Sequence, residues 1–126
     1  MNTMLAVEVE SIRKLRTDDL LRAVLYILCD EDFKPVPGIV ITGIAGDIKS
    51  DLNRTPLVIL KDGRGDYGSD FEDPSERFFR TNLRSKIIRP GELFTTWWAK
   101  PEQPNRTYET SFRIKKATPL AGLLAA

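Results

Sequence analysis

The clearest pattern of apolar and polar positions lies near the end of the chain. Between residues 107 and 115, Tyr108, Thr110, Phe112 and Ile114 alternate with the more polar Glu109, Ser111, Arg113 and Lys115. Because successive side chains of a strand point to opposite faces, this pattern predicts a strand with one buried and one solvated face. Residues 93–98 precede it across a Pro/Asn connection and are expected to form its hairpin partner. The predicted apolar face of the second strand consists of Tyr108, Thr110, Phe112 and Ile114.

Shorter runs of strand-forming residues recur along the rest of the chain, separated by clusters of Gly, Pro, Asp and Asn. Such runs predict strands at residues 6–12, 36–44, 56–61, 78–83 and 86–88. About seven short strands at this spacing favour an all-β fold, either an antiparallel β-sandwich or a small barrel. The Gly/Asp-rich segment 62–70 is expected to be a loop.

Residues 18–29 carry two competing patterns. Thr17 precedes two acids and an apolar stripe at helical spacing, which is typical of a helix start. The same segment ends in a continuous run, Val24 to Leu28, that is typical of a strand buried on both faces. The strand interpretation is preferred because a short acidic turn and the β-branched run 39–42 follow, as in an antiparallel pair. The alternative is an α+β fold with one helix at 18–29.

The turn between these two runs has the sequence Asp30-Glu31-Asp32-Phe33-Lys34-Pro35-Val36-Pro37-Gly38, and Asp62-Gly63-Arg64-Gly65 follows downstream. These turns resemble those of bacterial immunoglobulin-like domains and the related transthyretin-like modules, which carry D-x-x-G-K-P-V-x-G and D-G-x-G turns. Phe33 stands where that pattern has Gly. The resemblance covers about a quarter of the chain and implies an immunoglobulin-like β-sandwich that binds or spaces and does not catalyse.

Length and composition set the class of protein. The chain has 126 residues with 41% hydrophobic content, enough for one domain spanning 1–126 with a single core. Cys29 is the sole cysteine, which excludes an intrachain disulfide. The first ten residues do not read as a signal peptide, and the longest apolar run, 23–29, is far too short to span a membrane. We therefore expect a soluble cytoplasmic protein.

Charge is unevenly distributed although the formal net charge is only +1. Residues 1–75 contain nine Lys/Arg and fourteen Asp/Glu, a formal charge of −5, whereas residues 76–126 contain ten and four, a formal charge of +6. The two halves should attract each other. Histidine is absent, which excludes a His-dependent catalytic triad and removes the commonest metal ligand.

Acidic side chains offer the main alternative chemistry. The loop 62–73 supplies oxygen ligands of the kind that calcium takes, but its spacing does not match an EF-hand. Paired carboxylates such as Asp30 with Asp32, or Asp70 with Asp73, could serve acid/base hydrolysis if a cleft brought them together. Acids beside turns are more often solvated, so we predict no enzyme activity, no metal and no cofactor.

Basic and aromatic residues of the second half give the most specific functional signal. Arg77, Arg80, Arg84, Lys86 and Arg89 lie close in sequence to the aromatic hairpin. One of Trp97 and Trp98 must face outward, and that side chain is the predicted interface anchor, with Arg106 and Arg113 as rim contacts. The sequence thus predicts a non-catalytic module for protein binding or self-association. The alternative is a β-barrel that binds single-stranded nucleic acid through the same basic, aromatic half.

Overall fold

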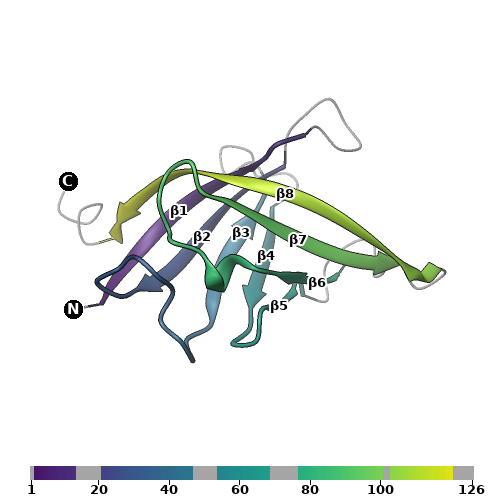
Figure 1. Cartoon of the computed structure of the whole chain (residues 1–126), viewed down its shortest axis with the longest axis horizontal. Helices are drawn as coiled ribbons and strands as arrows, with labels where there is room; N and C mark the ends of the chain where they lie inside the picture. The colour runs from purple at the N-terminus through teal and green to yellow at the C-terminus, as the bar shows by residue number, and fades with distance from the viewer. Residues whose placement is uncertain (1, 14–20, 47–53, 69–76, 101–102, 121–126) are drawn as a thin grey trace.

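Eight antiparallel strands form a closed barrel in which each strand pairs with its neighbours in sequence (Figure 1). The computed structural model describes residues 2–13, 21–46, 54–68, 77–100 and 103–120, with the backbone alone at 99–100 and 103–106. The strands are β1 Thr3–Ser11, β2 Arg22–Cys29, β3 Ile41–Ala45, β4 Thr55–Ile59, β5 Arg64–Asp66, β6 Phe78–Thr81, β7 Leu93–Lys100 and β8 Gln103–Pro119. A single 3₁₀ turn in the described residues, η2 Leu83–Ser85, follows β6.

The first and last strands close the barrel. The all-β, antiparallel prediction is confirmed, but a two-sheet immunoglobulin-like sandwich is not what forms, because β1 pairs with β8 as well as with β2. Glu8 lies opposite Lys116 in this seam, and the Lys115 Nζ lies 3.9 Å from the Glu10 Oε1. The acidic first half and the basic second half therefore meet where the barrel closes.

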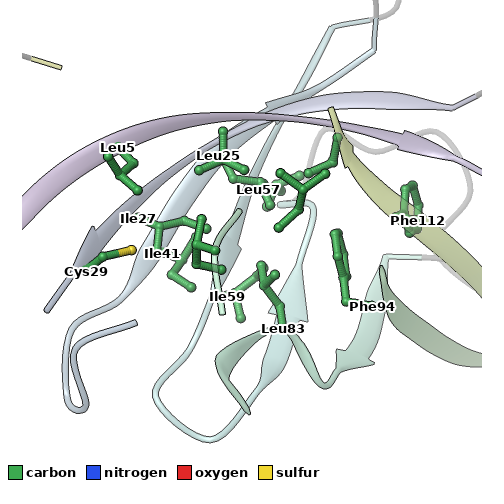
Figure 2. Close-up of a cluster of buried hydrophobic side chains, with 14 of the residues drawn as sticks. Leu5, Leu25, Ile27, Cys29, Ile41, Leu57, Ile59, Leu83, Phe94 and Phe112 are labelled. Carbon is green, nitrogen blue, oxygen red and sulfur yellow. The ribbon is translucent and has the colours of Figure 1, made fainter. Parts of the chain in front are cut away.

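The barrel interior is filled with apolar side chains from every strand except β5, whose inward residue is Gly65, and from the connection that follows β6. Inward positions alternate with outward ones along each strand, as an eight-stranded barrel with a packed interior requires. Figure 2 shows the inward side chains converging from opposite walls. The buried apolar set includes Leu5, Val7, Val9, Leu25, Ile27, Cys29, Ile41, Leu57, Ile59, Phe79, Leu83, Ile88, Phe94, Phe112 and Ile114.

The strand interpretation of the ambiguous segment is confirmed for residues 22–29. They form β2, which pairs antiparallel with β3 as the turn between them predicted. Residues 18–20 lie outside the described part of the chain. The preference for a strand follows from burial, because alternate residues Leu25, Ile27 and Cys29 face the packed interior.

The acidic turn after β2 is held by the Asp30 side chain. Its Oδ1 accepts hydrogen bonds from the backbone N–H of Asp32 (2.8 Å) and of Lys34 (3.1 Å), which satisfies a tight Asx-type turn. Phe33 occupies the left-handed region at φ 59°, a conformation that glycine adopts most readily. A bulky residue rarely adopts this conformation, so the turn keeps its shape at a cost in backbone strain.

The connection from β6 to β7, residues 82–92, closes one end of the barrel, and we call it the plug. The prediction of a strand at 86–88 is wrong, because η2 leads into an irregular segment that inserts Leu83 and Ile88 into the core. The Ile88 N–H donates to the Phe33 carbonyl at 2.7 Å. The plug is thus tied to the β2–β3 connection.

One strand was missed in the sequence. Residues 64–66, expected to belong to a loop, form β5 between β4 and β6. Gly65 faces inward against the Phe79 ring, and a Cβ added there would lie 2.0 Å from a ring carbon. Gly65 therefore occurs in this strand because the Phe79 ring leaves no room for a side chain, and not because the segment is a loop.

Candidate functional site

A groove on the barrel wall combines aromatic and charged side chains. It runs over β5, β6 and β7 and has a volume of about 570 Å³, within the range of small-ligand and peptide sites. Its lining is formed by Leu60, Arg64, Gly65, Asp66, Phe78, Phe79, Arg80, Trp97, Trp98 and Thr107. We refer to this hollow as the groove.

The groove is built on a row of outward side chains that crosses four strands. Arg64 on β5 lies opposite Arg80 on β6, and Arg80 lies opposite Trp97 on β7. Trp97 in turn lies opposite Glu109 on β8. Directly opposed residues are close enough for their side chains to interact. The barrel register therefore places two arginines beside a tryptophan, which no local pattern in the sequence does.

Phe78 lies next to this row on β6 and leaves 58% of its surface exposed. The Arg77 guanidinium carbon sits 4.7 Å from the centre of the Phe78 ring, a cation–π contact that holds the ring from one side. A large exposed aromatic next to a second outward aromatic is the kind of feature that marks interaction sites on soluble proteins.

Most arginines around the groove already have carboxylate partners. The Arg77 Nε donates to the Asp66 Oδ1 at 2.8 Å, and its Nη2 donates to Oδ2 at 3.3 Å. These hydrogen bonds, together with one from the Gly68 N–H, lower the pKa of Asp66. Likewise, the N–H and side chain of Arg64 lower the pKa of Asp62, with the Arg64 Nε 2.7 Å from Oδ2. These carboxylates stay ionised at neutral pH.

Arg80 differs from its neighbours. Its side chain is exposed in the groove and has neither a hydrogen bond nor a carboxylate partner among the residues that the structure describes. An exposed guanidinium next to aromatic rings is a donor group available to a partner.

The two tryptophans face opposite sides of the wall, as strand alternation requires. Trp97 faces outward, and its Nε1 donates to the Glu109 Oε2 at 3.1 Å. Trp98 faces inward, packs against the core, and stacks on Tyr108 with ring centres 5.8 Å apart. The Trp98 Nε1 is buried without a partner in the described structure. Trp97 is therefore the outward tryptophan of the pair, and Trp98 is the one that packs against the core.

Of the two predicted rim arginines, the structure describes the side chain of Arg113 alone and places it away from the groove. Arg113 is exposed on β8, opposite Leu93 and Glu10. It lies four residues along β8 from Glu109, a separation of about 13 Å. The side chain of Arg106 lies outside the described residues. The outward arginines next to Trp97 are instead Arg80 and Arg64.

The remaining basic residues of the predicted cluster serve other contacts. The Arg84 side chain donates to the backbone carbonyls of Ile39, Leu60 (2.8 Å) and Ile59 (3.5 Å), so it fastens the plug to two strand ends. The Arg89 Nε contacts the Glu92 Oε2 at 3.2 Å within the plug. Proximity in sequence to the aromatic hairpin thus did not translate into one basic surface.

The described carboxylates give little support to the calcium-site and paired-carboxylate hypotheses. Asp30 is used by its turn, and Asp62 and Asp66 by arginines, while Asp70 and Asp73 lie outside the described residues. Within the described ranges no three metal-ligating side chains gather. Cys29 is fully buried, and desolvation together with the Asp30 charge raises its pKa to about 11, which leaves the thiol unreactive.

Arg64 and Phe78 are the groove residues that the sequence reasoning overlooked. Two signals point to them in retrospect. Asp62-Gly63 between Leu60 and Arg64 is a hairpin turn sequence, which places Arg64 at the start of a strand. In the strand 78–81, inward Phe79 and Thr81 force Phe78 and Arg80 to face outward.

Comparison with protein-family models, curated proteins and solved structures finds no match to this chain. The resemblance to immunoglobulin-like and transthyretin-like turns therefore stays a prediction. The described residues include no helix of the length and apolarity that crossing a membrane requires.

Proposed function

We propose that this protein is a non-catalytic binding module that contacts a protein partner through the groove, with Trp97 as the anchor. The observation that carries the proposal is the outward row Arg64, Arg80, Trp97 beside the exposed Phe78. Trp and Arg are the residues most enriched among those that dominate binding energy at protein interfaces. Trp97 is already oriented by Glu109, so little side-chain freedom is lost on binding.

The charge around the groove favours a protein over a nucleic acid. Three arginines (Arg64, Arg77, Arg80) are balanced by Asp62, Asp66 and Glu109 among the described residues. A nucleic-acid backbone carries a charge at every nucleotide and is bound by a surplus of cations. A locally neutral surface with exposed aromatics lacks that surplus.

The same lining supports a non-catalytic role. Hydrolysis by paired carboxylates requires two acids facing one cleft. The described groove lining holds a single carboxylate, Asp66, whose oxygens are occupied by Arg77 and the Gly68 N–H. Binding is therefore the chemistry that these side chains favour.

The test is a selection of random linear peptides displayed on phage against the immobilised protein, with the double variant Trp97→Ala/Arg80→Ala as counter-target. We expect enriched peptides that bind the wild type and bind the double variant at least about tenfold more weakly. A tenfold loss of affinity corresponds to about 1.4 kcal/mol of binding free energy. Arg113→Ala is the matched control, because it removes an outward arginine outside the groove, and it should leave affinity unchanged.

Self-association is measured in parallel by sedimentation velocity at micromolar concentration. If the partner is a second copy, a dimer is present in the wild type and absent in Trp97→Ala. The proposal fails if no peptide distinguishes wild type from the double variant and the sedimentation of wild type and Trp97→Ala is identical. Steep, salt-sensitive binding of a labelled oligothymidine would instead favour the nucleic-acid alternative.

A further inference from the structure

Beside the groove, the described residues of β6 and β7 pair over a short stretch only. Pairing between β6 and β7 consists of Arg80 with Trp97 and Thr81 with Thr96, and it stops there. β7 continues to Lys100 along β8. In Figure 1 the β7–β8 hairpin accordingly reaches well past the start of β6. The edge of β7 beyond Trp97 has no paired strand among the described residues.

The backbone groups of Ala99 face this gap. The Thr95 N–H donates to the Asn82 Oδ1 at 2.8 Å and the Thr95 carbonyl accepts from the Thr81 Oγ1 at 2.9 Å, so the Thr95 backbone faces the β6 side. In an antiparallel strand, every second residue presents its N–H and C=O to the same neighbour. Ala99, four residues on, therefore presents its N–H and C=O toward β6, where no residue pairs with it.

On the other side of the gap lies Phe78, the first residue of β6. The Thr81 N–H donates to the Gly63 carbonyl at 2.9 Å, so the backbone N–H and C=O groups of Thr81 and Phe79 point toward β5. The backbone groups of Phe78, between them in the alternation, therefore point toward β7. Phe78 has a partner on β5 but none on β7. Among the described residues, two strand edges with unpaired backbone groups thus flank the same part of the groove, a typical template for an added strand.

The side chains beside the gap specify what kind of strand fits. Arg80 lies two residues along β6 from Phe78, about 7 Å away on the same face, which is the spacing between alternate residues of a strand. Arg80 is the described groove arginine without a carboxylate partner, whereas Arg64 and Arg77 have Asp62 and Asp66. The groove therefore offers one guanidinium that contacts no carboxylate and one exposed aromatic ring, spaced as alternate residues of an extended chain are.

We propose that the groove takes an extended segment of an acidic partner protein, which adds a strand in the gap beside Ala99 of β7. An Asp or Glu of that segment contacts Arg80, and an apolar residue two positions away packs between Phe78 and Trp97. This inference rests on the proposed function and names the conformation and chemistry of its partner. Backbone pairing supplies affinity, and the two alternate side chains supply specificity.

The test uses the tightest peptide from the display selection, synthesised with one N-methylated backbone nitrogen at a time. An added strand pairs through every second N–H along one edge, so N-methylation should weaken binding about tenfold at alternate positions and little between them. A charge exchange gives the second readout. Arg80→Glu should weaken binding of the acidic peptide at least about tenfold, and replacement of the peptide acid by Lys should restore it.

Folding of each variant is checked by circular dichroism and by protection of the Cys29 thiol, which is buried in the native barrel. Alternating N-methyl sensitivity with rescue by the charge exchange supports the added strand. Binding that needs Trp97 but tolerates every N-methyl group, or that is unchanged in Arg80→Glu, overturns it and leaves the proposed function standing. If no peptide depends on Trp97 or Arg80, the added strand is overturned, and the proposed function falls with it when wild type and Trp97→Ala also sediment identically.

Discussion

The two ends of strand β6 lead to opposite kinds of surface. After Thr81 the chain enters the plug, where Leu83 and Ile88 are fully buried in the barrel end. At Phe78, where β6 starts, pairing with β7 is absent and the side chain is more than half exposed. A single four-residue strand thus separates a connection with two fully buried side chains from a part of the wall where a large side chain is exposed.

The polar contacts differ in the same way. The plug is held by backbone carbonyls that accept from the partly buried Arg84, and by the Ile88 N–H bond to Phe33. The groove is lined by ion pairs such as Arg64 with Asp62, whose side chains are more than half exposed. Exposed ion pairs contribute little to stability. The comparison indicates that stability resides in the plug and the long strands, which leaves the groove side chains available for binding.

Leu83→Ala should break this comparison most strongly. The side chain is fully buried and plugs the barrel end, so its removal leaves a cavity and should lower the free energy of unfolding by about 3 kcal/mol. Urea denaturation followed by tryptophan fluorescence measures it. Leu93→Ala is the control, because that leucine is 45% exposed, and it should cost below about 1 kcal/mol. Equal effects of the two changes would refute the role of the plug.

Gly65→Ala probes the groove wall from the inside. The added methyl group would overlap the Phe79 ring, which must move from its contact with Tyr67. We expect the free energy of unfolding, measured by urea denaturation, to fall by about 2 kcal/mol. Cys29 should then react with thiol reagents at a lower urea concentration than in the wild type. The neighbouring Arg64 side chain faces outward, so Arg64→Ala should leave the free energy of unfolding nearly unchanged. A stable Gly65→Ala variant would mean that Phe79 does not occupy this space.

Trp97→Ala separates stability from binding. The side chain faces outward and contacts the wall through a cross-strand pair with Glu109, so the free energy of unfolding should fall by only about 1 kcal/mol. Binding of groove-dependent peptides should be lost in the same variant, as measured by fluorescence anisotropy. A large loss of stability would place Trp97 in the core and remove it as an anchor.

Asp66→Asn should have the smallest effect, visible in acid. Hydrogen bonds from Arg77 and Gly68 lower the pKa of Asp66 from its ordinary value of 3.8. A carboxylate with a lowered folded pKa stabilises the protein above its unfolded pKa, and that contribution disappears as pH falls through the folded pKa. The wild type should therefore lose stability more steeply than Asp66→Asn below about pH 3.8.

Arg77→Gln provides the background for this measurement. Without the arginine, the pKa of Asp66 should rise toward its ordinary value. Adding Asp66→Asn in that background should then no longer change how steeply the urea midpoint falls as the pH is lowered. An unchanged difference in the Arg77→Gln background would show that the Gly68 N–H, and not Arg77, controls the carboxyl group.

Local patterns in the sequence predicted the features that depend on neighbouring residues. The alternation over 107–115 gave a strand with Phe112 and Ile114 inward, and the run before the Asp30 turn gave β2 and its pairing with β3. The same patterns misplaced a strand at 86–88 and overlooked β5. In both cases a non-local partner decided the outcome: the core for Ile88, and the Phe79 ring for Gly65.

The amino-acid sequence by itself determined an all-β chain, the alternation that sends one of two adjacent tryptophans outward, and opposite charges in its two halves. The tertiary structure decided that the strands close into a barrel, that Trp97 is the outward residue, and that Arg80 and Arg64 lie beside it while Arg113 does not. The physical reason is register. Alternation fixes the period of a strand, but pairing with distant strands fixes which face is outward and which side chains meet.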